Sequence, residues 1–573
     1  MGSGAVRGHP ARATGTCANT NCWYSLNPYH SRTAFYWKEP PLDYIAISTI
    51  VLYLGGVTAV GAFMVRKSKG STEWAVAGGG MSGALVAFAL AGSRIGGAGT
   101  YGVAGAVIDG GVWNMWWYGI SSLLAMAFVG LFFAVYYRRL GLQTVAELFA
   151  VRFGSRRCQW LTSFCVQTEY AIVNVIEAYV IGVILSSLTP LTMFQGVLIA
   201  AAVFSTYVSL GGIWGTAVTN VIHSVVILVS LLAVGVSGVR EMGGWDAVTL
   251  QVDARLAASP AHSQAGWWGF AGAGWLPAFG MLFAAAIHSP AASIYANFST
   301  ATRSERSLAP AFIVGGMIAA LMPILAGVIG ILAVAQYGLD AGLAGYDNIT
   351  AIASEISPLM GGIAIAAVLA AVISSGGPIL LSSATMLVRD WMPSSAGYSS
   401  ERRLRTYRLV TVCYAVVAAL VAWWFATQTE MSILDLLLFG FAMVVPPAIS
   451  VAFTLYWRRT TEEGAFWGML IGYASGGVWF VLIKWALWVG LEAPQGSSAL
   501  REFWVSLLTR DGVGLDPSYV TTLIPLITVP LVSILTRSRE ADGGAAAEAL
   551  FRERLRGVEV QEPLESTGPR SVP

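Results

Sequence analysis

A single arginine stands among small residues in an otherwise apolar stretch, SGALVAFALAGSRIGGAGTYGVAGAVIDGGVWNMWW, residues 82–117. Each glycine in such a stretch weakens a helix by roughly 1 kcal/mol relative to alanine. Several glycines around Arg94 therefore predict a membrane helix that is interrupted near its centre. An interrupted helix exposes backbone carbonyls and amides, which can bind ions and polar solutes. The small residues concerned are Gly92, Ser93, Gly96, Gly97 and Gly99.

Other ionisable side chains also lie within long apolar runs. Glu169 and Glu177 are eight residues apart, so both can face the interior of a helix bundle. His288 stands beside Ser289-Pro290, where a helix is expected to bend. Buried charges in membranes are mostly functional, and histidine can carry a proton near neutral pH. The alternatives are that the glutamates make polar contacts between helices and that the histidine packs with its own partners satisfied.

The chain that must position these residues has the composition of a membrane protein. Of its 573 residues, 56% are hydrophobic and 11% are charged, whereas soluble proteins have about 25% charged residues. Apolar runs of about 20 residues predict an all-α integral membrane protein with about 13 transmembrane helices. The runs are 43–65, 82–109, 112–137, 158–188, 190–211, 216–238, 268–297, 308–336, 360–388, 406–427, 432–457, 464–490 and 518–537.

The charges of the loops predict the orientation of the chain. Cytoplasmic loops of membrane proteins are rich in Lys and Arg. If residues 1–42 lie outside, the predicted inside loops include those around Arg138 and Arg403, both of which are rich in arginine. The predicted outside loops at 109–112, 188–190, 337–359 and 428–431 carry no Lys or Arg. We therefore expect the N-terminus outside and the C-terminus in the cytoplasm of a cell (inner) membrane.

The predicted topology divides the chain into three parts. Residues 1–42 are expected to be a disordered tail outside the membrane, unless Cys17 and Cys22 close a disulfide loop or the start site is misassigned. Residues 43–537 form the transmembrane domain, and residues 538–573 a disordered cytoplasmic tail. Between two spans, GLQTVAELFAVRFGSRR (141–157) predicts a short amphipathic helix that begins with a capping box of Thr144 and Glu147.

Four segments resemble the motifs of one known family. QTVAELFAVRFG (143–154), GGIWGTAVTNVIH (211–223), AAVISSGGPILLSSATMLVRD (370–390) and TEEGAFWGMLIG (461–472) occur in the family's order and in the expected topology. The chain resembles the sodium:solute symporters, which include proline, pantothenate, sugar and monocarboxylate carriers. This resemblance implies a LeuT-type fold of two inverted five-helix repeats. One extra helix would precede the repeats and two would follow them.

The resemblance also implies sodium-coupled uptake by alternating access, with Na+ held between the interrupted helix and the span 360–388. The ligands carried over are the carbonyls of Gly92, Ile95 and Ala371 and the hydroxyls of Ser374 and Ser375. Independently, the last three residues share one helix face, because they lie at positions i, i+3 and i+4. The alternative is that both serines bond carbonyls of their own helix.

The chain departs from the family where charge matters. The T-D of the 211–223 motif is Thr219-Asn220, its final Gln is His223, and the D-S of the 370–390 motif is Gly377-Pro378. Arg94 also brings a positive charge close to the expected ion. Two like charges about 5 Å apart repel by about 3 kcal/mol at an effective dielectric of 20.

Three interpretations of Arg94 follow. It can pair with a solute carboxylate, it can replace the sodium ion, or it can pair with Glu169 or Glu177 as a structural contact. The first is favoured, because the guanidinium fork matches a carboxylate. The predicted solute-binding residues are Ser93, Arg94, Gly96, Gly97, Glu169 and His288.

The sequence thus predicts a secondary active transporter that carries a small carboxylate or amino-acid-like solute, anionic or zwitterionic, with Na+. The alternatives are a symporter-like sensor that binds its solute without pumping, and a carrier that is proton-coupled or uncoupled because Arg94 replaces the ion. No enzyme activity is expected, because no catalytic motif stands in its required context. The expected partners are the solute and the lipid bilayer, and no nucleic acid.

Overall fold

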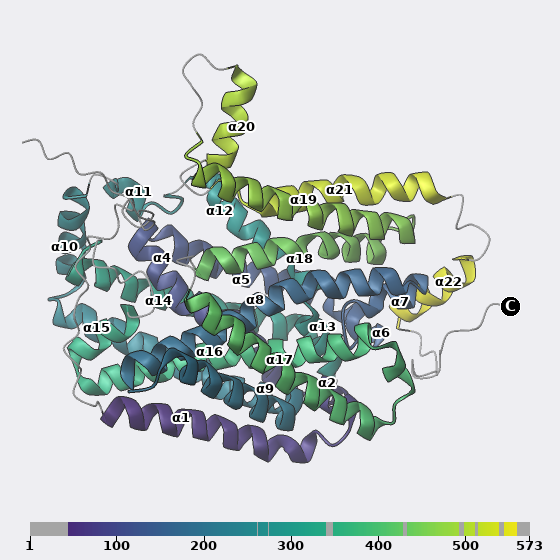
Figure 1. Cartoon of the computed structure of the whole chain (residues 1–573), viewed down its shortest axis with the longest axis horizontal. Helices are drawn as coiled ribbons and strands as arrows, with labels where there is room; N and C mark the ends of the chain where they lie inside the picture. Colours follow the sequence, from purple (N-terminus) through teal and green to yellow (C-terminus); the bar gives the residue numbers. More distant parts are fainter. Residues whose placement is uncertain are drawn as a thin grey trace, which may run out of the picture. The chain divides into compact units, whose positions relative to one another are not determined.

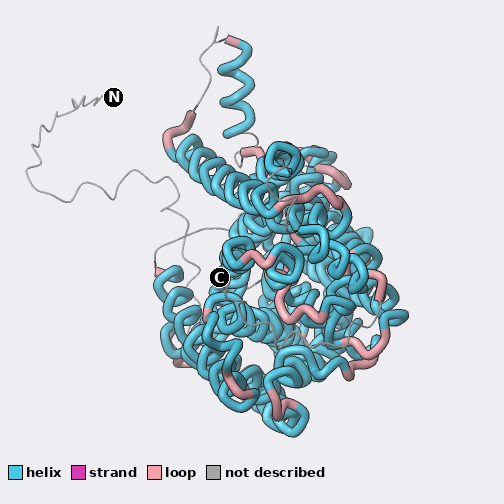
Figure 2. The backbone as a smooth tube through the Cα atoms, turned by 90° about the vertical axis from the view of Figure 1, so that its right-hand side faces the viewer, coloured by secondary structure: helices cyan, strands magenta, loops and turns pink. Residues whose placement is uncertain are grey.

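The computed structural model describes residues 44–259, 262–272, 274–339, 348–427, 433–491, 498–509, 514–537 and 544–557. These segments are almost entirely helical (Figure 2). Within them, extended pairing is limited to one isolated parallel bridge between Met81 and Thr302. The predicted all-α architecture is therefore confirmed. The predicted N-terminal tail, with Cys17 and Cys22, lies outside the described residues.

Ten helices of the described chain are long and apolar enough to cross a membrane, or eleven if one bent pair counts as a span. They are α1 (Tyr44–Phe63), α5 (Trp113–Phe132), α8 (Arg156–Leu188), α9 (Met193–Glu241), α14 (Leu308–Tyr337), α16 (Pro358–Met386), α17 (Ser400–Ala426), α18 (Ile433–Tyr456), α19 (Glu462–Trp488) and α21 (Pro517–Thr536). The predicted count of thirteen is not confirmed, because breaks in the backbone divide the chain differently from its apolar runs.

Shorter helices connect or flank these spans (Figure 1). They are α2 (Ser71–Val76), α6 (Ala134–Leu140), α7 (Glu147–Phe153), α10 (Trp245–Ala257), α11 (Gln264–Trp268), α15 (Asn348–Ile356), α20 (Ala499–Thr509) and α22 (Gly544–Leu555).

The helix predicted to be interrupted is broken at one residue. The stretch consists of α3 (Gly83–Gly97), a π-helical turn η3 (Ala98–Gly102) and α4 (Val103–Gly110). Gly96 leaves the helix with φ 55° and ψ −175°. A β-carbon on Gly96 would lie 2.3 Å from Glu177 Oε1, so both the conformation and the space require glycine. The interruption predicted for residues 92–99 is thus present and confined to Gly96.

A second broken helix occupies the predicted span 268–297. It consists of α12 (Trp275–Leu282), a π-helical turn η4 (Phe283–Ile287), a 3-10 turn η5 (Ser289–Ala291) and α13 (Ser293–Ala301). The axis bends by 51° before α13. Pro290 lacks the N–H that a continuous helix needs, and Ala292 is extended with ψ 108°. Each of the two predicted repeats therefore begins with a broken helix.

The long helix α9 joins two predicted spans, 190–211 and 216–238. Its 49 residues would extend about 74 Å if straight, more than twice the ~30 Å hydrocarbon core of a bilayer. Gly212 bends it, with φ 54° and ψ −151°. A β-carbon there would lie 2.7 Å from the carbonyl oxygen of Trp74 in α2. The glycine pair of the 211–223 motif thus marks the bend.

Helix α16 lies at the centre of the bundle. In its most apolar membrane-spanning window, 89% of the residues are buried. It packs against α1, α3, α8, α9 and α17 (Figure 1). The contact with α3 places Ser374 and Ser375 beside the broken helix, which is where the candidate site lies.

Part of the expected C-terminal tail is ordered. Helix α22 packs against α6 and α7. Glu548 of α22 forms ion pairs with Arg152 and Arg552. The expectation of a disordered tail therefore does not hold for Gly544–Leu555, while the boundary at residue 538 stays a prediction.

Candidate functional site

The hydroxyl of Ser374 joins α16 to the last turn of α3 before the break. Its Oγ lies 2.9 Å from the carbonyl oxygen of Gly92 and 2.7 Å from that of Ala371. All three residues are buried. The structure thus brings together three of the five predicted sodium ligands, as an oxygen cluster shared by two helices.

The other two predicted ligands, Ile95 and Ser375, lie beside this cluster and have other partners. The Ile95 carbonyl accepts the N–H of Ala98. Ser375 Oγ donates to Glu177 Oε1 at 2.5 Å and lies 3.4 Å from the Ala371 carbonyl. Both serines also donate to carbonyls of their own helix, which is what the alternative interpretation of these residues predicts.

Asn220 of α9 ties three helices together beside the oxygen cluster. Its Nδ2 lies 2.9 Å from the Ala89 carbonyl, 3.0 Å from the Ser374 carbonyl and 3.3 Å from Ser93 Oγ. Pro378 has no N–H to offer the Ser374 carbonyl four residues earlier, so the Asn220 amide supplies the missing donor. The two departures from the family pattern, Asn220 and Pro378, thus compensate each other.

Two glycines make room for these side chains. A β-carbon on Gly92 would lie 2.8 Å from the amide of Asn220. A β-carbon on Gly377 would lie 1.5 Å from the hydroxyl of Tyr207, which donates to the Ile373 carbonyl at 2.9 Å. Any larger residue at position 377 would displace Tyr207.

Arg94 lies two residues before the break at Gly96 and is buried, with 6% of its surface exposed. Its Nη2 donates to the Ala285 carbonyl at 3.2 Å, and its Nε lies 3.4 Å from Ser122 Oγ. The guanidinium lies 4.9 Å from the centre of the Phe441 ring. Among the described residues, no carboxylate forms an ion pair with Arg94, including the two glutamates of α8. The interpretation of Arg94 as a purely structural residue requires an ion pair with Glu169 or Glu177, and the described residues do not form that pair.

Glu169 and His288 face each other in the same region. Their nearest atoms, Oε1 and Nε2, are 3.9 Å apart, which is longer than a hydrogen bond. His288 Nδ1 lies 2.6 Å from the Ala284 carbonyl and must carry the proton there, because a carbonyl only accepts. The ring stacks on Phe441 at 4.2 Å. The second oxygen of Glu169, Oε2, is buried and has no hydrogen-bond partner among the described residues.

These side chains line one cavity at the break, here called the central cavity. Its volume is about 30 Å³, which is room for one or two water molecules. The walls would have to separate to admit a solute. Its polar lining residues are Ser93, Arg94, Glu169, Glu177, His288, Tyr295 and Ser375.

Five of the six predicted solute-binding residues line the central cavity: Ser93, Arg94, Gly96, Glu169 and His288. The sixth, Gly97, does not, and its N–H instead donates to both oxygens of Glu177 at 3.1 and 3.2 Å. Sequence reasoning missed the two aromatic residues of the lining, Tyr295 and Phe441. An aromatic residue in an apolar run carries no signal that separates a cavity wall from ordinary packing.

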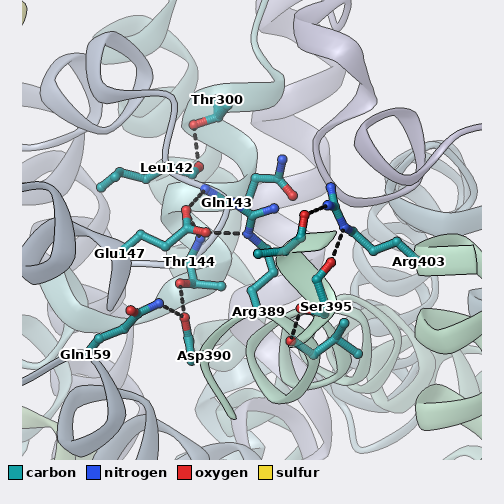
Figure 3. Close-up of polar contacts among 12 residues, drawn as sticks. Leu142, Gln143, Thr144, Glu147, Gln159, Thr300, Arg389, Asp390, Ser395 and Arg403 are labelled. Carbon is teal, nitrogen blue, oxygen red and sulfur yellow. Dashed lines mark hydrogen bonds and ion pairs between the residues drawn. The ribbon is translucent and has the colours of Figure 1, made fainter. Parts of the chain in front are cut away.

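A second polar cluster lies around the start of α7 (Figure 3). Glu147 accepts from the Thr144 backbone amide at 3.4 Å, which is one half of the predicted capping box. The Thr144 hydroxyl instead donates to Asp390 at 3.0 Å, and Gln159 donates to the same carboxylate at 2.7 Å. Glu147 also forms an ion pair with Arg389 (Figure 3). The cluster therefore connects the loop before α7 to the end of α16.

Comparisons with known proteins point to the family that the four sequence motifs resemble. The model of the sodium:solute symporter family matches residues 74–472. An uncharacterised symporter of Bacillus subtilis, YwcA, is 24% identical over 439 residues, which cover 72% of this chain and 81% of YwcA. The high-affinity proline transporter PutP of the same species is 28% identical over 158 residues, covering 27% of this chain and 32% of PutP.

Two solved structures share the arrangement of helices. A Na+-coupled sialic acid symporter in a substrate-bound outward-open state superposes with a TM-score of 0.64 at 18% identity, over 85% of this chain and 98% of that chain. Mhp1, a nucleobase-cation-symport-1 family transporter, superposes with a TM-score of 0.51 at 16% identity, over 84% and 98%. The fold is the LeuT type, with two inverted repeats that each begin with a broken helix.

Proposed function

Because this chain belongs to the sodium:solute symporter family and is a Na+-coupled symporter, we propose that its solute is a small carboxylate or amino acid bound in the central cavity. The observation that carries the proposal is that Arg94 and Glu169 both line that cavity without contacting each other in an ion pair. Arg94 has no carboxylate partner among the described residues, and Glu169 Oε2 has no hydrogen-bond partner there. Buried charges without partners are costly, so a ligand that supplies both partners would bind favourably.

We assign the two ends of the solute accordingly. The carboxylate of the solute binds the guanidinium of Arg94, whose planar fork fits two carboxylate oxygens. An ammonium group on the solute, where present, binds Glu169. Phe441 packs behind Arg94 and His288 and keeps both side chains in place. Ser93 and the backbone at Gly96 complete the polar wall.

We assign the sodium ion to the oxygen cluster of Gly92, Ala371 and Ser374. Ile95 and Ser375 lie beside this cluster and would complete the site when their oxygens turn toward the ion. Na+ prefers oxygen ligands, and unwound backbone beside a helix with hydroxyl groups supplies them in transporters of this architecture. Both α3 and α16 contribute ligands, so binding of the ion would stabilise one arrangement of these two helices.

Transport by alternating access follows from the size of the cavity. A volume of about 30 Å³ is too small for an amino acid, so the cavity must open to one side at a time. From the distribution of Lys and Arg in the loops, we propose that the N-terminus lies outside and the C-terminus in the cytoplasm of a cell (inner) membrane.

The test is uptake of radiolabelled solutes into proteoliposomes that contain the purified protein. Proline, alanine, acetate and lactate form the first panel, each with an inward Na+ gradient and with choline in place of Na+. We expect Na+-dependent accumulation of at least one member. Accumulation that follows a proton gradient and ignores Na+ would favour a carrier in which Arg94 replaces the ion. Saturable binding without accumulation would favour a sensor.

A further inference from the structure

Glu177 is a buried carboxylate that the four sequence motifs do not include. It lies on α8, with 2% of its surface exposed, and reaches the break in α3. Both of its oxygens accept the N–H of Gly97, at 3.1 and 3.2 Å. Its Oε1 also accepts the hydroxyl of Ser375 at 2.5 Å. Glu177 therefore contacts the broken helix and a predicted sodium ligand at once.

The negative charge of Glu177 can affect sodium binding, because the residues of the proposed sodium site are neutral. Asn220 and Gly377 stand where the family motifs carry aspartate, so the oxygen cluster of Gly92, Ala371 and Ser374 contains no formal negative charge. Arg94, two residues after Gly92, adds a buried positive charge. A sodium ion in this cluster would thus meet a repelling cation and neutral ligands alone, unless a carboxylate lies nearby.

We propose that Glu177 is the counter-charge of the sodium ion, acting through Ser375 on the α16 side of the break. This inference rests on the proposed sodium site. It accounts for the balance of charge around the central cavity: Arg94 and the ion contribute two positive charges, and Glu169 and Glu177 contribute two negative charges. A solute that is neutral overall, such as a zwitterionic amino acid, then leaves the closed complex neutral in a medium where net charge is costly.

A carboxylate is also suited to respond to the ion. Ser375 Oγ lies 2.5 Å from Glu177 and 3.4 Å from the Ala371 carbonyl, which is part of the oxygen cluster. A small rotation of Ser375 would turn a lone pair toward the ion while its hydroxyl hydrogen stays on Glu177. Binding of Na+ would thereby fix α8, α3 and α16 in one arrangement.

Glu177→Gln separates this role from a purely structural one. Glutamine keeps the size of the side chain and an oxygen that can accept the Gly97 N–H, and it removes the charge. We expect the Na+ concentration for half-maximal uptake to rise by roughly tenfold to a hundredfold, since a unit charge about 5 Å away has an effect of that order at an effective dielectric of 20. Glu177→Asp should recover part of the loss.

The matched control is Asp390→Asn, which neutralises a buried carboxylate that lies beyond the end of α16, in the cluster with Thr144 and Gln159. Stabilisation by NaCl is measured for both variants, as the shift of the thermal transition in detergent with choline chloride as reference and no solute present. Glu177→Gln should need at least tenfold more NaCl for half of the shift, while Asp390→Asn stays within about twofold of the unmodified protein.

Equal NaCl requirements for Glu177→Gln and the unmodified protein would overturn the role of Glu177 and leave the proposed sodium site intact. An unmodified protein that NaCl does not stabilise, and whose uptake ignores Na+, would refute the proposed site itself. If Glu177→Gln does not fold, Glu177→Asp is compared with Asp390→Asn. The shorter carboxylate of Glu177→Asp lies farther from the ion, so this variant should need more NaCl than Asp390→Asn, by a smaller factor than tenfold. Equal NaCl requirements of the two variants would count against the proposal.

Discussion

Arg94 carries a full positive charge within a membrane helix and is held by neutral groups. The Ala285 carbonyl, Ser122 and the face of Phe441 surround it. Such contacts orient a guanidinium without neutralising it. A residue that binds an anionic group of a ligand is expected to have such neutral contacts, because a permanent ion pair would compete with that ligand.

Replacing Arg94 should separate solute binding from ion binding. We expect Arg94→Ala to abolish uptake of carboxylate-bearing solutes, and Arg94→Lys to raise the KM at least tenfold, since an ammonium group cannot form the two-pronged contact. The same Arg94→Ala protein should need less NaCl for half-maximal stabilisation, because the repelling charge is gone. Initial rates in proteoliposomes and thermal transitions in detergent measure the two effects. Uptake by Arg94→Ala at the unmodified rate would place the solute elsewhere.

Asn220 and Pro378 form a coupled pair at the residue scale. We expect Asn220→Ala to lower the stability by about 1–3 kcal/mol, because the Ser374 carbonyl loses its donor in a buried site. Pro378→Ala restores an N–H to α16 that can bond the same carbonyl. The cost of Asn220→Ala should therefore be smaller in the Pro378→Ala background, which a double-mutant cycle of thermal transitions measures. Strict additivity of the two changes would contradict the compensation.

At the scale of elements, the broken helices and α16 form the functional unit. Gly96 breaks α3, and the N–H group of Gly97 beside the break donates to Glu177 of α8. The cluster at the start of α7 connects the other end of α16 to the loop that precedes α7 and to Gln159 of α8 (Figure 3). Helix α16 is thus anchored both at the candidate sodium site and near its C-terminal end.

Gly96→Ala tests whether the break itself is required. A β-carbon at φ 55° is strained and would lie 2.3 Å from Glu177 and 2.7 Å from Ser375. We expect this variant to lose all Na+-dependent uptake and to unfold at a lower temperature. Gly55→Ala in α1 is the matched control, since its β-carbon would meet no atom within 4 Å. A Gly96→Ala protein with normal uptake and stability would show that the helix tolerates a different path.

At the scale of the whole molecule, residues of both inverted repeats line the central cavity. Arg94, Glu169 and Glu177 line the cavity, and the proposed sodium ligands Gly92, Ala371 and Ser374 lie next to it on α3 and α16. Net charge in that volume decides which pairs of ion and solute can be enclosed together. The same balance of charge fixes the current that accompanies each transport cycle.

We therefore expect uptake of an amino acid to be electrogenic. One Na+ and one zwitterion move one net positive charge inward, and an inside-negative potential of 100 mV adds about 2.3 kcal/mol to the driving force. This corresponds to roughly fiftyfold greater accumulation. A valinomycin-induced potassium potential in proteoliposomes should raise uptake of the amino acid, whereas a monocarboxylate carried with one Na+ should not respond. Uptake of an amino acid that ignores the potential would exclude this stoichiometry.

The amino-acid sequence by itself determined the membrane class, the helical architecture and the broken helix. Hydrophobic runs and glycine content can be read locally from the sequence. In a bilayer they indicate structure directly, because apolar segments must form helices to satisfy their backbone hydrogen bonds. Five of the six residues predicted to bind the solute line one cavity, because glycines and ionisable side chains in apolar runs mark the interior of a membrane bundle. The predicted count of 13 helices stays unconfirmed, and the bend at Gly212 and the break at Gly96 depend on contacts with Trp74 and Glu177, which are distant in the sequence.

Only the tertiary structure decided how the departures from the family pattern are accommodated. Asn220 supplies the donor that Pro378 removes, and Gly377 leaves room for Tyr207. Glu177 brings a carboxylate to the break from a different helix than the motifs indicate. Contacts between residues 80 to 200 positions apart leave no periodic signal along the chain, so packing between helices, and not spacing within them, set the electrostatics of the candidate site.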